Sequence, residues 1–300
     1  MISWVSNKPG LRSSRRPNPV AAKTAGAVTA LCLSNDHTFI AVGHENGYIY
    51  LYDLAKHQAP ARTVTPTSLA AVASGRKDGH IAGSRIVSLS FVGARHTAIV
   101  SADEQGLAFY HSLGQVLFVE ASDTLRILGK YPPAPTPGTK IPNPRRSSSI
   151  LAAETLPLGP APHPVDQYQL IALLTASKLV IVGLKPQPRT WHRIHREDEP
   201  NMRGCLAWFP STVAHKDGDK NEPVAGATRP MLVFAWGRHF HLIRVREEKP
   251  PTPPNPRRGG PQPKPFVPTL VFESGGKWKT HAEVLAVQWL NVQVCAVIGK

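Results

Sequence analysis

The chain has 300 residues, 41% of them hydrophobic, and a formal net charge of +15 at pH 7. This hydrophobic content is enough to fill cores between packed sheets. The most apolar stretch, residues 170–184, is too short to cross a membrane and contains Lys178, so we expect no transmembrane segment. The three cysteines have no paired spacing, which excludes a recognisable zinc or disulfide framework and is typical of a reducing compartment.

Residues 1–26 form a basic start that we expect to be a disordered lead-in. The segment is rich in serine and free of acidic residues, as in a mitochondrial transit peptide. However, Pro9, Pro17 and Pro19 would break the amphipathic helix that a transit signal needs. The disordered lead-in is therefore the favoured interpretation.

The stretch LCLSNDHTFIAVGHENGYIYLYDL, residues 31–54, alternates apolar residues with a period of two and is interrupted twice by turn residues. This pattern predicts three short antiparallel strands. Asp36 lies in the first turn, and Asp53 ends the third strand. Asn46-Gly47 in the second turn predicts a type I′ hairpin, because glycine adopts positive φ angles at little cost. A meander this short cannot bury its own faces, so we expect it to repeat.

The same pattern returns along the chain. Residues 89–111 repeat it, with Asp103 and Gly106 in the hairpin turn that corresponds to the turn of Gly47. Repeats built from short strands predict propeller blades. Further copies lie at residues 169–182, at 205–209 together with 231–245, and from 284 onward.

We therefore expect an all-β fold, an incomplete β-propeller of about four to five blades in residues 27–300. Clustered prolines predict long insertions at 131–144 and 250–268. Because the fifth unit stops at Lys300, we expect an open ring whose terminal blades expose apolar faces and favour self-association. The blades are expected near residues 27–54, 86–128, 148–184, 205–246 and 268–300.

The first repeat resembles a WD40 repeat, in which a turn aspartate, a hairpin glycine and a final aromatic-aspartate pair recur. Asp36, Gly47 and the pair Tyr52-Asp53 match these positions. In the second repeat Tyr110-His111 replaces the final pair. WD40 spacing alone is shared by many unrelated proteins, so it indicates the fold and not the function.

A narrower resemblance rests on residues 74–129. This segment contains His80 and Gly83-Ser84 before a strand, and then the sequence SADEQG. Together with VQWLN at residues 287–291, it is similar to the N-terminal propeller of the fungal vacuolar protein sorting protein eight family. The resemblance implies a subunit of the CORVET tethering complex on early endosomes.

The resemblance also implies partners and a location. The partners would be an activated endosomal Rab GTPase and the other tethering-complex subunits, in transport toward the vacuole. The implied location is cytoplasmic and peripheral on endosomal and vacuolar membranes. The alternative is a WD40-type scaffold of another complex, associated with RNA on account of the charge.

The charge itself argues for solvated basic loops. The basic runs contain prolines and few aromatic residues, whereas nucleic-acid grooves interleave cations with stacking aromatics. We therefore expect no nucleic-acid binding, but a weak electrostatic contact with anionic membrane surfaces.

No motif for catalysis, phosphate binding or metal binding is evident. His192 and His195 could meet on a helical turn, and His239 and His241 could share a strand face, but neither pair has a third ligand. We expect no enzymatic activity, no cofactor and no metal. Structural roles are expected in blade turns for Asp36, Gly47, Asp53, Asp103 and Gly106, and between blades for Trp208, Trp236 and Trp289.

Overall fold

The strands form antiparallel sheets that follow the order of the chain. The computed structural model describes residues 24–56, 58–94, 96–116, 119–132, 148–215, 223–248 and 269–300. Within them lie four sheets of four strands and two hairpins of two strands. Most of the two expected insertions, at 131–144 and 250–268, and nearly all of the expected lead-in at 1–26 lie outside the described residues.

Each four-stranded sheet is a meander whose strands pair with their chain neighbours. The first contains β1 (Val28–Leu33), β2 (Phe39–His44), β3 (Ile49–Asp53) and β4 (Arg62–Val64). The second contains β5 (Ile86–Phe91), β6 (Ala98–Asp103), β7 (Ala108–Val116) and β8 (Val119–Leu128). The third contains β9 (Ile150–Thr155), β10 (Leu170–Thr175), β11 (Lys178–Gly183) and β12 (Arg189–His195).

The fourth sheet is interrupted by a small hairpin. It contains β13 (Gly204–Phe209), β16 (Met231–Trp236), β17 (His239–Glu247) and β18 (Leu270–Lys279). The hairpin of β14 (Val213–His215) and β15 (Pro223–Ala227) lies in the link between its first two strands. The chain continues with the hairpin of β19 (Val284–Trp289) and β20 (Cys295–Gly299); the short helices are α2 (Leu69–Ala73) and the 3₁₀ helix η1 (Pro164–Tyr168).

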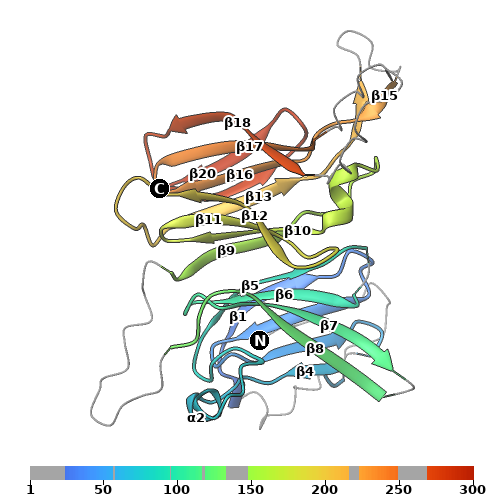
Figure 1. Cartoon of the computed structure of the whole chain (residues 1–300), viewed down its shortest axis with the longest axis vertical. Coiled ribbons are helices and arrows are strands. Elements are labelled where there is room, and N and C mark those ends of the chain that lie inside the picture. Colours follow the sequence, from blue (N-terminus) through green and yellow to red (C-terminus); the bar gives the residue numbers. More distant parts are fainter. Residues whose placement is uncertain are drawn as a thin grey trace, which may run out of the picture.

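The sheets pack face to face in sequence, as blades of a propeller do. Their first strands lie side by side, with β1 on β5, β5 on β9, β9 on β13 and β13 on β19. Figure 1 shows the blue and cyan sheets in one half of the molecule and the orange and red strands in the other. A separate apolar cluster fills each junction between neighbouring sheets. In β10, Ile171 and Leu173 pack toward the second sheet, while Ala172 and Leu174 pack toward the fourth.

The tryptophans expected between blades are found there. Each indole Nε1–H donates to a backbone carbonyl of the neighbouring sheet: Trp208 to Glu154 at 3.2 Å, Trp236 to Thr175 at 2.8 Å, and Trp289 to Ala207 at 3.0 Å. The indole ring makes apolar contacts between the sheets, and the N–H hydrogen bond fixes the orientation of the ring. These three bonds fix the relative position of the third and fourth sheets and of the last hairpin.

The sheets extend beyond several of the expected blade boundaries. β18 pairs with β17 and therefore completes the fourth sheet, although residues 268–300 were expected to form a fifth unit. The expected insertion at 250–268 thus falls inside the fourth sheet. Likewise β12 extends the third sheet to His195, and β4 extends the first to Val64. The fourth strand of each sheet follows a longer link, so the short-range alternation of the meander does not reveal it.

One histidine interpretation is wrong. His192 and His195 lie on the strand β12, where His192 pairs with Ile181, and not on a helical turn. The alternation of Trp191, Arg193 and His195 with His192 and Ile194 suits a strand at the edge of a sheet. Their side chains therefore point to opposite faces.

Two apolar surfaces remain uncovered, so the ring is not closed. On the first sheet, Ala30 and Cys32 pack against the second sheet, whereas Leu31 and Leu33 are 54% and 48% exposed. On the last hairpin, Leu285 and Ile298 are 48% and 62% exposed.

Within the described residues, no helix has the length and apolar character needed to cross a membrane.

Candidate interaction site

Asp36 joins the first turn of one sheet to that of the next. Its Oδ1 accepts hydrogen bonds from Ser34 Oγ at 2.6 Å and Thr38 Oγ1 at 2.7 Å. Its Oδ2 lies 2.9 Å from Nδ1 of His96, which precedes β6. These bonds, led by that from Ser34, hold the pKa of the Asp36 carboxyl well below its usual value. Asp36 therefore connects the loops of two blades on one rim of the stack.

Gly47 and Gly106 occupy equivalent hairpins, but the turn type differs from the expected type I′. Gly47 has φ of 86° and Gly106 has φ of 93°, whereas Asn46 is not at positive φ. The Gly47 N–H donates to the His44 carbonyl and the His44 N–H to the Tyr48 carbonyl. This is a type I turn over Glu45 and Asn46 closed by glycine in a bulge, because three residues and not two separate the paired strands.

Asp53 has a local and exposed role. Its Oδ1 accepts the backbone N–H of Ala55 at 2.8 Å, which closes the turn after β3. Asp53 therefore belongs to a turn.

Asp103 instead lies at the end of a buried hydrogen-bonded network. Its Oδ1 accepts the Leu107 N–H at 2.9 Å, and its Oδ2 lies 2.7 Å from His80 Nδ1. His80 Nε2 lies 2.7 Å from Ser101 Oγ, which lies 2.7 Å from His111 Nε2. His80 reaches this network from the link between the first and second sheets, while Ser101 and His111 come from β6 and β7.

The set Ser101, His80 and Asp103 has the bonding order of a hydrolytic triad. All three are buried, with exposed fractions of 0%, 1% and 0%. A nucleophile must reach its substrate, and the Ser101 hydroxyl is fully buried. In this environment the three residues fix the link between sheets and present no reactive group at a surface.

One direction of hydrogen donation satisfies the whole network. Burial lowers the pKa of the His111 imidazole to about 3, so His111 is neutral near pH 7. Thr124 Oγ1, 3.1 Å away, then donates to His111 Nδ1. His111 Nε2–H donates to Ser101, Ser101 donates to His80 Nε2, and His80 Nδ1–H donates to Asp103.

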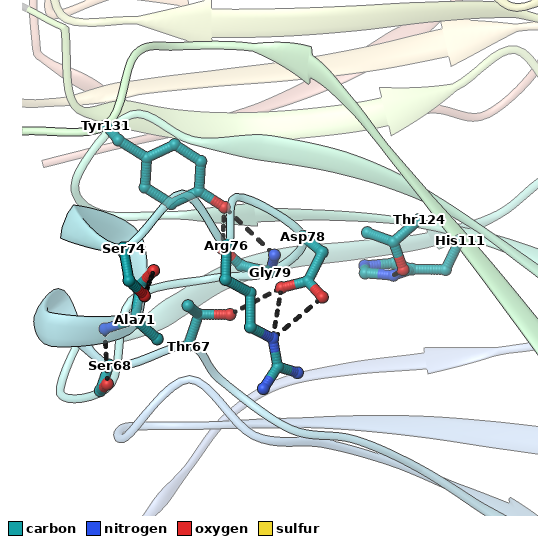
Figure 2. Close-up of polar contacts among 10 residues, drawn as sticks. All are labelled: Thr67, Ser68, Ala71, Ser74, Arg76, Asp78, Gly79, His111, Thr124 and Tyr131. Atoms are coloured by element: carbon teal, nitrogen blue, oxygen red, sulfur yellow. Dashed lines mark hydrogen bonds and ion pairs between the residues drawn. The ribbon is translucent and has the colours of Figure 1, made fainter.

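A second, more exposed layer of polar contacts lies beside this network. Figure 2 shows Arg76, Asp78 and Tyr131 near α2, with the pair His111 and Thr124 to their right. Asp78 Oδ1 accepts from Thr67 Oγ1 and from Arg76 Nε, both at 3.0 Å. Burial opposes ionisation of Asp78, but the bonds from Arg76 and Thr67 lower the pKa of its carboxyl overall.

Tyr131 fastens this layer to the second sheet. Its hydroxyl donates to the carbonyl of Gly79 and accepts the Gly79 N–H at 3.1 Å. The Arg126 guanidinium lies 5.4 Å from the Tyr131 ring centroid, at cation–π distance. The segment of residues 65–85 is thus held in one conformation with Arg76 and Asp78 more than half exposed, as a surface for a partner requires.

The family model described as "Vps8 beta-propeller" matches residues 13–300. The chain belongs to the Vps8 beta-propeller family. This match confirms both the suspected family and the propeller class. Two curated relatives, the vacuolar protein sorting-associated protein 8 homologs of Mus musculus and Homo sapiens, are each 24% identical over 227 residues. The match covers 75% of this chain but 13% of each relative, so the chain spans a small part of their length.

Two solved structures are similar to this Vps8 propeller, both with TM-scores below 0.5. A chain of the Mitotic Checkpoint Complex is 15% identical, with a TM-score of 0.44 over 87% of this chain and 55% of that one. The Cps50 (Swd1) β-propeller domain of Myceliophteria thermophila is 10% identical, with a TM-score of 0.42 over 86% of this chain and 60% of that one.

Several residues of the Vps8 propeller's network were not identified from sequence. Thr124 and Tyr131 lie in ordinary strand or loop contexts and gave no local signal, and Ser101 entered only as the first residue of the SADEQG motif. His80 and His111 were noted only because they entered the family resemblance. Within the described residues, no group of three or more His, Cys, Asp or Glu side chains is placed to hold a metal ion.

The network predicts that this Vps8 propeller loses stability in mild acid. The unfolded chain binds a proton at His111 below about pH 6.5, whereas the folded chain does so only near pH 3. Acidification therefore favours unfolding, and from pH 7 to pH 5 the expected loss from His111 is about 2 kcal/mol. The measurement is the free energy of unfolding by urea at both pH values.

His111→Gln serves as the matched variant, because the glutamine amide can still donate to Ser101 but does not titrate. Burial also lowers the pKa of His241, to about 4, and raises the pKa of Glu154 to about 7, so other groups add their own pH dependence. The difference between the two proteins isolates His111. An identical loss in both between pH 7 and pH 5 would rule out His111 as the cause.

Proposed function

We propose that this propeller is a non-catalytic protein-interaction module that serves vacuolar protein sorting on endosomal membranes. The observation that carries the proposal is the Vps8 family match over residues 13–300. The names of the curated relatives place those proteins in vacuolar protein sorting. A rigid stack of sheets that presents loops to partners suits such a role.

The chemistry of the described residues supports docking and not catalysis. The one triad-like set is buried, as shown by the 0% exposure of Ser101. Burial also raises the pKa of the Cys32 and Cys295 thiols and raises that of Cys205 to about 11. Protonated thiols are poor nucleophiles, so these cysteines act as small apolar residues.

The proposed partners are an activated endosomal Rab GTPase and the other subunits of a CORVET-type tethering complex. Vesicle tethering requires a component that reads the nucleotide state of a membrane-bound switch protein. GTP-bound and GDP-bound Rab differ in ordered switch loops, which a preformed surface can distinguish. We further propose a cytoplasmic location, peripheral on endosomal and vacuolar membranes, with the net charge of +15 adding attraction to anionic lipid.

A nucleotide-dependent pull-down tests this function. Full-length protein is passed over immobilised endosomal Rab loaded with a GTP analogue or with GDP. We expect about tenfold more retention on the GTP form, an energy difference of about 1.4 kcal/mol. A deletion variant of the protein without residues 27–300 should lose this difference.

Asp53→Ala is the matched control, since it removes only the acceptor for the exposed Ala55 N–H and should bind Rab as the parent does. Equal retention on both nucleotide forms, or undiminished binding without the propeller, would contradict the proposal. Sequence-selective RNA binding that persists at physiological salt would instead support an RNA-associated scaffold.

A further inference from the structure

A shallow cavity of about 360 Å³ lies beside the start of β16, lined by Thr228, Arg229, Met231, Arg244 and Val292. Four elements form it: the link before β16, the strands β16 and β17, and the turn between β19 and β20. Met231 and Arg244 are paired neighbours on β16 and β17. The cavity therefore lies where the fourth sheet meets the last hairpin.

The charged wall of this cavity contains one arginine without a partner. Arg229 Nη1 and Arg246 Nε each lie 2.6 Å from a different oxygen of Glu273. Hydrogen bonds from Arg246 and the nearby Arg229 lower the pKa of the Glu273 carboxyl, so it stays ionised and holds both arginines. Arg244 is exposed, and no acceptor is found for it among the described residues.

The local charges do not cancel. Arg229 and Arg246 occupy the two oxygens of Glu273, whereas Arg244, the register partner of Glu273 on β17, is paired with neither oxygen. A guanidinium presents a planar set of donors that matches a carboxylate in two parallel hydrogen bonds. Arg244 is therefore available to bind an acidic group supplied from outside.

An apolar surface continues from the cavity. Met231 forms a buried floor at 6% exposure, while Val292 at the edge is 38% exposed. In the same turn, Leu290 and Val294 are 66% and 46% exposed. The turn is held by the Leu290 N–H donating to the Val294 carbonyl at 2.9 Å, so these side chains are presented in a fixed arrangement. Exposed apolar groups next to an unpaired charge are typical of a binding surface.

From these contacts we infer that the cavity between Arg244 and Val292 docks a short acidic–apolar segment of a partner protein. An aspartate or glutamate of the segment pairs with Arg244, and a neighbouring large apolar side chain packs on Met231 and Val292. The positive charge of the chain attracts such a segment over longer range. The inference rests on the proposed interaction role and adds the chemistry of a partner and a place where it binds.

An immobilised peptide array tests the site with full-length protein. Each peptide has 12 residues with a central Glu-Leu pair in varied flanks, and matched peptides carry Gln-Leu or Glu-Ser instead. We expect about tenfold more retention on Glu-Leu than on Gln-Leu peptides, which corresponds to about 1.4 kcal/mol. Replacing leucine by serine should reduce retention about fivefold, through loss of apolar contact.

Matched variants locate the binding. Arg244→Glu should abolish the preference for Glu-Leu, and Val292→Ser should abolish the preference for leucine over serine. Arg193→Glu is the control, because it makes the same charge change on the exposed face of β12, away from the cavity. It should keep the tenfold preference, and all three variants should melt near the parent because the altered side chains are exposed.

Several results would overturn the inference. These are an Arg244→Glu variant that keeps the preference, or an Arg193→Glu variant that loses as much as Arg244→Glu. If Arg244→Glu changes only the sedimentation of the protein and not its peptide binding, the occupant is a second copy of the chain and the inference is wrong. The array contains no Rab, so its result does not depend on the outcome of the Rab pull-down. A failure of the proposed Rab binding and a failure of this inference can therefore be told apart.

Discussion

Replacing Asp103 with alanine should lower the free energy of unfolding by about 2–6 kcal/mol, since two buried donors each lose an acceptor at about 1–3 kcal/mol. The carboxylate is fully buried and accepts from His80 Nδ1 and from the Leu107 N–H. Without it both donors remain in the core with no acceptor, and water cannot replace the lost bonds. A loss of this size is a large share of the stability of a typical domain, so a substantial fraction of the variant should be unfolded at 37 °C. Urea denaturation followed by circular dichroism measures the effect.

Asp53→Ala is the comparison for this result. Its carboxylate bonds one exposed N–H, so the expected loss is about 1 kcal/mol. If Asp103→Ala destabilised the protein no more than Asp53→Ala does, Asp103 would be a turn residue like the other aspartates. The network would then contribute little to joining the first and second sheets.

Gly106→Val should be more damaging than Gly47→Val, with a loss of more than about 3 kcal/mol. Gly106 has φ of 93°, which a β-branched residue adopts only under strain. In addition, a Cβ here would meet the Ser148 carbonyl oxygen at 2.4 Å, which is backbone and cannot rotate away. The second sheet and the chain that enters the third would have to separate locally.

Gly47→Val separates strain from collision. Its φ of 86° is similar, but the nearest atom to its Cβ would be the Ile81 carbonyl oxygen at 3.0 Å. We expect a loss of more than about 1–2 kcal/mol at this position, smaller than at Gly106. Equal losses at the two sites in urea denaturation would show that the backbone angle alone determines the cost, and that the contact with Ser148 has no effect.

The meanders could be predicted from sequence because their information is local. In each repeat the alternating apolar residues and the turn glycine, Gly47 or Gly106, lie within about twenty residues. The period of two and the turn residues were therefore enough to predict the strands. The turn type was wrong because an Asn-Gly pair suits both a two-residue turn and a three-residue turn with a bulge. Only the strand register, with His44 bonded to Tyr48, distinguishes them.

The candidate sites could not be predicted because they depend on contacts between residues far apart in the sequence. Asp103 was expected in a hairpin turn. Its partner His80 lies 23 positions away, in a loop without periodicity. The cavity beside Arg244 likewise joins β17 to a turn near residue 292. The alternation of residues along a strand does not indicate which exposed side chains become neighbours when the sheets pack together.

The separate apolar clusters between sheets have a consequence for how the molecule opens. In the described residues each apolar cluster joins two neighbouring sheets, so cooperativity passes along the stack one junction at a time, as in other repeat proteins. Amide protons of β10 and β11, strands buried on both faces, should exchange with solvent only when the whole stack unfolds. Those of β19 and β20 should exchange earlier, by opening of a single junction. Opening of the junction at β19 and β20 can thus occur while the central sheets keep their structure.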